Sequence, residues 1–101
     1  MYKRQIAVLV DDMIDTAGTV TEAALALKKE GALKVYAVCS HPVLSGPAHK
    51  RIEESAIEKV ICTDTIPLLK KNPKIEVVSA SKLFANAILR IHKGSSLSKL
   101  F

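Results

Sequence analysis

The run IAVLV, residues 6–10, constrains the fold of this chain most, because every residue in it is apolar and most of them favour strands. A strand with one face in water alternates apolar and polar residues, whereas a strand covered on both faces does not. The run therefore predicts a central strand of a parallel sheet. From Thr19 the spacing becomes that of an amphipathic helix, which Gly31 is expected to end, with an apolar stripe of Val20, Ala23, Ala24 and Leu27.

The alternation of strand and helix continues along the chain. A second buried strand is predicted over 34–40, a short helix over 48–55 and a third strand ending near Thr63. A fourth short strand, IEVVS, precedes a helix whose expected N-cap is Ser79 or Ser81 and whose apolar positions are Phe84, Ala87, Ile88 and Ile91. This order predicts an α/β fold with three layers and a mostly parallel sheet.

The length of 101 residues suits one domain with a modest core. A central strand needs a neighbour on each side, and this one begins only six residues into the chain. We therefore expect residues 6–101 to be a truncated domain, the C-terminal part of something larger, with one neighbouring strand supplied from outside it. Residues 1–5 are interpreted as a non-native or disordered start.

Composition narrows the class of protein. Hydrophobic residues make up 49% and charged residues 25%, which is typical of soluble globular chains, and no apolar run approaches the ~20 residues that span a bilayer. We find no secretory signal and expect a cytoplasmic protein without a membrane partner. The net charge of +5 favours anionic ligands, but scattered basic residues and only 4% aromatics argue against nucleic acid. Cys39 and Cys62 are expected to be buried, reduced thiols.

The junction VLVDDMIDTAGT, residues 8–19, is the strongest functional signal. In parallel sheets, ligands bind beyond the carboxyl ends of strands, where helix N-termini present free N–H groups. Small residues in DTAGT let backbone amides approach an anion closely, which predicts a phosphate cradle. A structural interpretation stands beside it, in which Thr19 and Glu22 form a capping box that starts the helix.

The adjacent carboxylates of Asp11 and Asp12 favour a ligand at this junction. Two unpaired carboxylates repel each other unless a cation or hydrogen-bond donors arrive. A sugar cis-diol supplies donors and a divalent cation supplies charge, so the residues predict a phosphorylated sugar, with or without Mg²⁺.

The same stretch resembles the ribose 5-phosphate loop of ribose-phosphate pyrophosphokinases, also called phosphoribosyl pyrophosphate synthetases. The stretches SGPAHKRI, TDTIPL, KIEVVSASKLFANAILRIHKG and SLSKLF also fit this family, and the similarity covers essentially everything after residue 5. The resemblance implies a fold like that of type I phosphoribosyltransferases, and a homo-oligomer of the hexamer-of-dimers type. It implies that Asp11 and Asp12 contact the ribose hydroxyls and that the 5-phosphate is surrounded by Asp15, Thr16, Ala17, Gly18 and Thr19.

The resemblance also bears on residues whose implied role is less specific than direct contact with the sugar. Asp15, beside a phosphate, is expected either to contact the ligand or to accept hydrogen bonds that hold the loop in shape. Ser96 and Ser98 match a tail that, in phosphate-regulated members, helps form an allosteric phosphate site. Pro42 stands where the family usually has glycine, which fixes a backbone angle and removes a donor. His41 and His49 lack partners at metal-ligand spacing, so no metal ligand is assigned.

The reaction implied by the resemblance is transfer of a diphosphate from ATP to the C1 hydroxyl of ribose 5-phosphate, with Mg²⁺ as cofactor. The catalytic Lys and Arg loop, the metal-binding His and most of the ATP site have no counterpart here, so no catalytic residue is assigned and the chain alone is expected to be inactive. Three alternatives stay open: a non-catalytic regulatory homologue, a type I phosphoribosyltransferase, and a phosphoreceiver domain with Asp64 as a third carboxylate.

Overall fold

A computed structural model describes residues 4–94 of the chain. Its elements are β1 (Ile6–Ile14), α1 (Gly18–Lys29), β2 (Lys34–Pro42), α2 (Ala48–Glu53), β3 (Ile57–Thr63), β4 (Ile75–Val78) and α3 (Ser81–Lys93). The four strands form one sheet in the order β1-β2-β3-β4, and each neighbouring pair is parallel. The predicted parallel α/β fold is confirmed.

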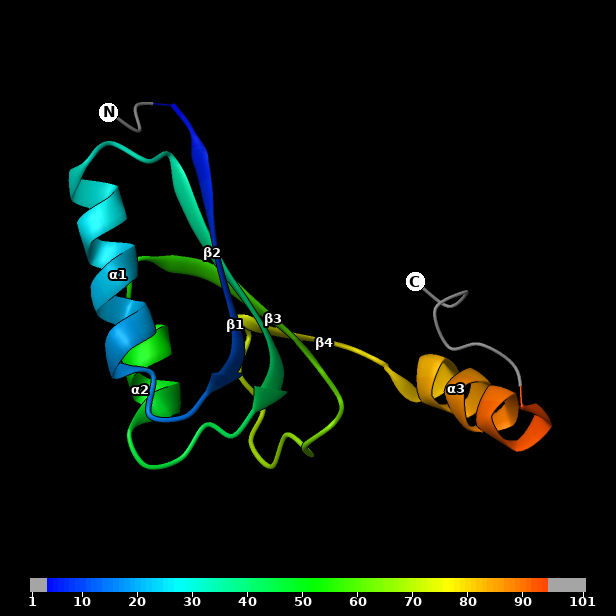
Figure 1. Ribbon diagram of the computed structural model, residues 1–101. Helices are drawn as coiled ribbons and strands as arrows, with labels where there is room; N and C mark the ends of the chain where they lie inside the picture. Colours follow the sequence, from blue (N-terminus) through cyan, green and yellow to red (C-terminus); the bar gives the residue numbers. More distant parts are fainter. Residues whose placement is uncertain (1–3, 95–101) are drawn as a thin grey trace.

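The core lies between the sheet and the two helices α1 and α2, which cover the same face (Figure 1). Small and β-branched residues of β2 and β3 point toward these helices, and Ala24 and Ile52 point back from α1 and α2 with no exposed surface. The sheet side of this core includes Ile14, Val35, Ala37, Cys39, Ile57, Val60 and Cys62. Both cysteines are buried and free, as predicted.

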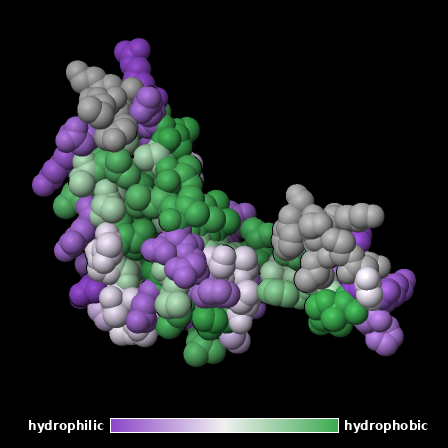
Figure 2. Space-filling model, in the orientation of Figure 1, coloured by the Kyte–Doolittle hydropathy of each residue, from purple (hydrophilic) through white to green (hydrophobic). Residues whose placement is uncertain are grey.

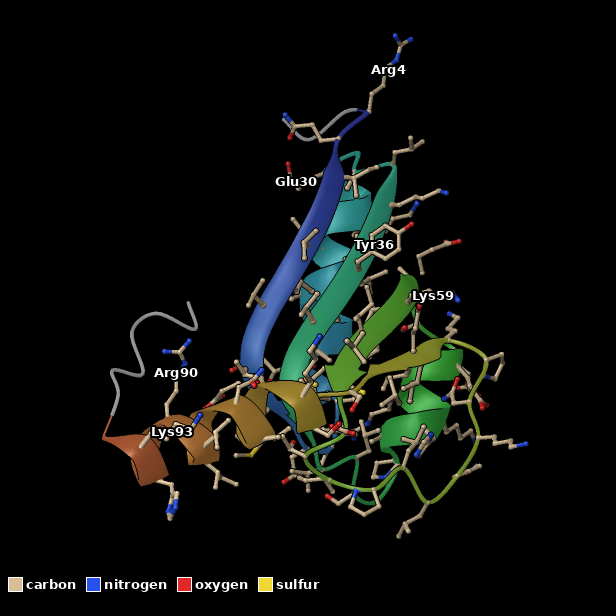
Figure 3. The ribbon with its side chains drawn as sticks, turned by 90° about the vertical axis from the view of Figure 1, so that its right-hand side faces the viewer. Arg4, Glu30, Tyr36, Lys59, Arg90 and Lys93 are labelled. Carbon is tan, nitrogen blue, oxygen red and sulfur yellow. The ribbon has the colours of Figure 1, made fainter. Side chains whose placement is uncertain are left out.

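The opposite face of the sheet is not covered by a helix of the described residues. Figure 3 looks onto this face, with α1 behind the sheet and Tyr36 and Lys59 on neighbouring strands. The third layer of the predicted arrangement is thus not supplied by residues 4–94.

Strand β1 differs from its prediction as a central strand. It pairs only with β2 and is an edge strand of the described sheet. Its residues Ile6, Val8 and Val10 are 59%, 54% and 77% exposed, and Figure 2 shows hydrophobic side chains gathered along this edge. The unbroken apolar run indicates side chains suited to burial on both faces of the strand. The described residues cover only the face that includes Ala7 and Leu9, and they cover it in part.

Helix α3 forms at the predicted place and extends away from the sheet (Figure 1). None of its residues is buried, and its large apolar side chains are 40% to 67% exposed. Its N-cap is Ala80, not Ser79 or Ser81 as predicted, because the carboxylate of Asp64 accepts the Ala80 amide at 2.8 Å. No helix within residues 4–94 combines the length and apolar character needed to cross a membrane.

Helices α2 and α3 give a direct test of where stability resides, because α2 packs in the core and no residue of α3 is buried. Replacing the fully buried Ile52 by alanine is expected to lower the free energy of unfolding by about 2–5 kcal/mol, because lost burial and a residual cavity add. Ile88→Ala is the matched control, since Ile88 also lies in a helix but is 67% exposed. Chemical denaturation followed by circular dichroism measures both; equal losses would contradict the assignment of the core.

Candidate binding site at the start of helix α1

A pocket lies where β1 ends and α1 begins. Figure 1 shows this junction at the carboxyl end of β1. Its volume is ≈ 330 Å³. Its polar part is formed by the predicted junction, and the strands and α1 supply apolar walls that include Leu9, Val20 and Val38. Of the predicted ligand-binding residues, six line it: Asp11, Asp15, Thr16, Ala17, Gly18 and Thr19.

The helix end at this pocket has no side-chain cap. The N-cap residue is Ala17, which is buried and adopts the left-handed conformation with φ 65° and ψ 13°. The amides of a first helical turn have no partners within the helix, so they carry partial positive charge and bind anions. An uncapped helix end inside a pocket is therefore suited to a phosphate.

The predicted capping box of Thr19 and Glu22 is wrong. The helix already begins at Gly18, which places Thr19 inside the first turn instead of at the N-cap. The hydroxyl of Thr21 donates to the carbonyl oxygens of Ala17 at 2.6 Å and Gly18 at 3.1 Å. The Thr21 side chain thus forms its hydrogen bonds with carbonyl oxygens, and the amides of the first turn are not occupied by the predicted capping box.

The two residues of the acidic pair differ in their position relative to the pocket. The structure continues β1 to Ile14, four residues beyond the predicted run, so Asp11 and Asp12 are consecutive strand residues. Asp11 lines the pocket, whereas Asp12 does not. The Asp12 amide donates to Asp11 Oδ1 at 2.8 Å. The Asp12 side chain and this amide hold the pKa of Asp11 below its ordinary value, so Asp11 is an anionic acceptor at neutral pH.

Asp15 holds the turn in shape. Its carboxylate accepts a short hydrogen bond from the Ser45 hydroxyl, and its carbonyl accepts the Ser45 amide at 2.9 Å. One residue earlier, the Ile14 carbonyl accepts the Leu44 amide at 3.0 Å. Asp15 thus contacts a hydroxyl of a distant segment through its carboxylate, where hydrogen bonds from loop amides were predicted, and it also lines the pocket.

Sequence reasoning did not identify Ser45 or Arg51 as site residues. Arg51 of α2 donates through Nη1 to the Thr16 carbonyl at 3.1 Å. Both residues lie 30 or more positions after the loop they contact, so no local spacing could reveal the contact. The sequence signal that includes both residues is the stretch SGPAHKRI, which resembles the corresponding stretch of the family.

The remaining candidate residues lie elsewhere. Asp64 accepts hydrogen bonds from the Ala80 amide and the Ser79 hydroxyl, which lower its pKa, and so it fixes the start of α3. His41 pairs with the Thr65 hydroxyl at 2.8 Å and His49 with Asn72 at 3.3 Å. Residues 4–94 contain no group of three or more His, Cys, Asp or Glu placed to hold a metal. Ser96 and Ser98 lie outside the described residues.

The fold and the pocket together define a parallel α/β protein with a pocket at a strand-to-helix turn. Residues 2–101 match the family described as the phosphoribosyl synthetase-associated domain. The chain belongs to this family, and the resemblance to ribose-phosphate pyrophosphokinases found in the sequence is confirmed.

Individual relatives agree with this assignment. A ribose-phosphate pyrophosphokinase of Caldanaerobacter subterraneus is 58% identical, over 98% of this chain and 32% of that protein. Ribose-phosphate pyrophosphokinase 2 of Enterococcus faecalis is 57% identical, over 93% and 30%. The crystal structure of phosphoribosylpyrophosphate synthetase from Mycobacterium smegmatis superposes with a TM-score of 0.89 at 36% identity, over 93% and 32%. The chain thus spans about a third of the length of these relatives.

The lowered pKa of Asp11 has a measurable consequence. We expect its carboxyl carbon resonance to titrate below the ordinary value of 3.8. For a carboxyl group with a lowered pKa, the contribution to folding is present above the ordinary pKa and is lost as the pH falls through the lowered one. A pH series of carbon-detected NMR spectra measures this; a midpoint at or above 3.8 would contradict the described hydrogen bonds.

Proposed function

We propose that the pocket at the start of α1 binds ribose 5-phosphate. The phosphate would lie against the amides of the first helical turn, and the ribose hydroxyls would donate to Asp11, which lines the pocket, whereas Asp12 does not. The observation that carries the proposal is the uncapped start of α1, which opens into a pocket with a carboxylate at its strand side.

Charge is arranged along the pocket to suit such a ligand. Asp11 supplies negative charge on the strand, and the amides at Ala17, Gly18 and Thr19 supply partial positive charge on the helix. A sugar phosphate has donors at one end and an anion at the other, so it satisfies both ends together. Thr16 and Thr19 line the same pocket, and their hydroxyls would be further donors to the phosphate.

The family to which the chain belongs suggests the reaction in which this ligand takes part. We propose that the parent protein transfers a diphosphate from ATP to the C1 hydroxyl of ribose 5-phosphate, giving phosphoribosyl pyrophosphate and AMP. This chain would hold the acceptor sugar, most of the ATP site would lie in the other two thirds of such a protein, and the protein would work as a cytoplasmic homo-oligomer. The chain alone would form no AMP.

Magnesium fits the residues only in part. Carboxylates are the ligands that Mg²⁺ prefers, and it is usually held by one or two of them together with substrate oxygens. Asp11, which lines the pocket, would supply one such ligand, and residues 4–94 include no complete protein-derived set. When bound, Mg²⁺ would neutralise phosphate charge.

The affinities for ribose 5-phosphate and for inorganic phosphate test the carboxylate end and the phosphate end of the site separately. We expect ribose 5-phosphate to shift the amide NMR signals of Asp15 to Thr19, and Asp11→Asn to weaken its binding about tenfold, because hydrogen bonds to a charged acceptor are lost. Inorganic phosphate should bind Asp11→Asn no more weakly than the original chain, since a nearby negative charge is removed. Titrations monitored by NMR give all the dissociation constants.

Glu58→Gln is the matched control, because it also converts an exposed carboxylate to an amide but lies at the opposite end of its strand from the pocket. It should leave both affinities unchanged. Absence of any shift at Asp15 to Thr19 with saturating ribose 5-phosphate and Mg²⁺ would reject the proposed function.

A further inference from the structure

The segment 45–51 supports the phosphate-binding turn from outside the pocket. Ser45, at its start, holds Asp15 through both side chain and backbone, and Arg51, at its end, holds the carbonyl of Thr16. No residue of this segment lines the pocket, and its polar contacts to the turn are made to Asp15 and Thr16. The segment is therefore placed to act on the turn and not directly on a ligand within the pocket.

Arg51 lies on the far side of the turn from the pocket. It does not line the pocket, but lines a shallow groove between α1 and α2, formed with Gly18, Thr21, Glu22, Leu25, Glu54, Ser55 and Ala56. Its backbone is fixed in α2, where its amide donates to the Pro47 carbonyl at 2.9 Å. The guanidinium thus approaches the turn from a helix that is itself packed in the core through Ala48 and Ile52.

The hydrogen bond to Thr16 sets the direction of the next amide. The described chain has no cis peptide bonds, so the carbonyl of Thr16 and the amide of Ala17 point in opposite directions across one peptide plane. With the carbonyl held by Arg51, the Ala17 N–H must point away from the guanidinium. A cation on the carbonyl also polarises the peptide and strengthens its N–H as a donor.

We propose that Arg51 is a positioning residue for the anion site: it fixes the Thr16–Ala17 peptide so that the Ala17 amide, together with the first amides of α1, faces the phosphate. This inference rests on the proposed function and adds a residue that does not touch the substrate. Successive amides around a left-handed residue form an anion-binding concavity, and Ala17 is the left-handed residue here.

The glycine at position 18 fits this arrangement. A Cβ atom built on Gly18 would lie 3.1 Å from Arg51 Nη1 and 3.9 Å from its Cζ. The φ angle of Gly18 is not positive, so the backbone itself accepts other residues. The absence of a side chain therefore makes room for the guanidinium.

The first experiment compares Arg51→Met, Arg51→Lys and the control Lys50→Met in the full 101-residue chain. Lys50→Met removes the same charge from a neighbouring exposed position of α2. We expect Arg51→Met to weaken ribose 5-phosphate and inorganic phosphate about tenfold while leaving ribose unaffected, and Lys50→Met to weaken neither phosphate by more than about twofold. Arg51→Lys should be intermediate, since it keeps the charge but loses the planar donor group.

Chemical rescue separates positioning from general stability. Millimolar guanidinium added to Arg51→Ala should restore phosphate affinity, whereas the same concentration of sodium chloride should not. Loss of stability alone would not be repaired by guanidinium, which at high concentration denatures proteins. An unrescued loss, or a loss equal for ribose and ribose 5-phosphate, would overturn the inference.

The spacing at Gly18 supplies an independent variant. Gly18→Ala should weaken phosphate binding in the original chain by crowding the guanidinium, and should have a smaller effect in the Arg51→Ala background, where the methyl group has room. Equal effects in both backgrounds would mean that the methyl group blocks the ligand directly and would count against the role of Arg51.

A measurement without ligand distinguishes failure of this inference from failure of the proposed function. The carbonyl carbon signal of Thr16 and the amide nitrogen signal of Ala17 should move in Arg51→Met and stay in place in Lys50→Met. If these signals move but no sugar phosphate binds the original chain, the positioning is right and the ligand is wrong. If ribose 5-phosphate binds and the signals do not move, Arg51 does not set this peptide.

Discussion

The turn from β1 into α1 is the constraint on which the site depends. The chain leaves an extended strand at Ile14 and enters a helix at Gly18, and it does so through Ala17 in the left-handed conformation. That conformation costs a residue with a side chain about 1–2 kcal/mol. Burial of Ala17 and hydrogen bonds from Ser45, Thr21 and Arg51 offset this cost. The helix end therefore stays open to the pocket because other residues of the chain hold the turn.

Two kinds of support act on this turn, and they are separated along the sequence. The parallel pairing of β1 with β2 brings the carboxyl ends of both strands to one edge of the sheet, next to the start of α1. The segment that follows β2 then returns to the turn, first through Ser45 and later through α2. The pocket and the turn that lines it thus lie within a β1–α1–β2–α2 unit.

Local patterns in the sequence predicted the parts of this structure that depend on neighbours along the chain. The apolar spacing after Thr19 located α1, Gly31 ended it with φ 99°, and the predicted junction supplied the polar lining of the pocket. The exact cap was not predictable in this way, because Ala17 is not a residue that normally caps helices. The turn before the helix is held by contacts with Ser45 and Arg51, which lie in a different part of the sequence.

Local sequence patterns also could not predict which apolar side chains the rest of the chain covers. The residues of β1 and the apolar side of α3 have the character of buried positions, yet they are exposed in the described residues. A periodicity shows which side chains are suited to burial, but not which part of a protein covers them. In a chain that spans about a third of the length of its relatives, the two properties need not agree.

The most direct test of the account is a crystal structure of this chain with ribose 5-phosphate. The account predicts the phosphate within hydrogen-bond distance of the amides at the start of α1, the ribose hydroxyls at Asp11, and Arg51 still on the Thr16 carbonyl behind the turn. A sugar phosphate bound elsewhere, or bound in the reverse orientation with its phosphate at Asp11, would contradict it.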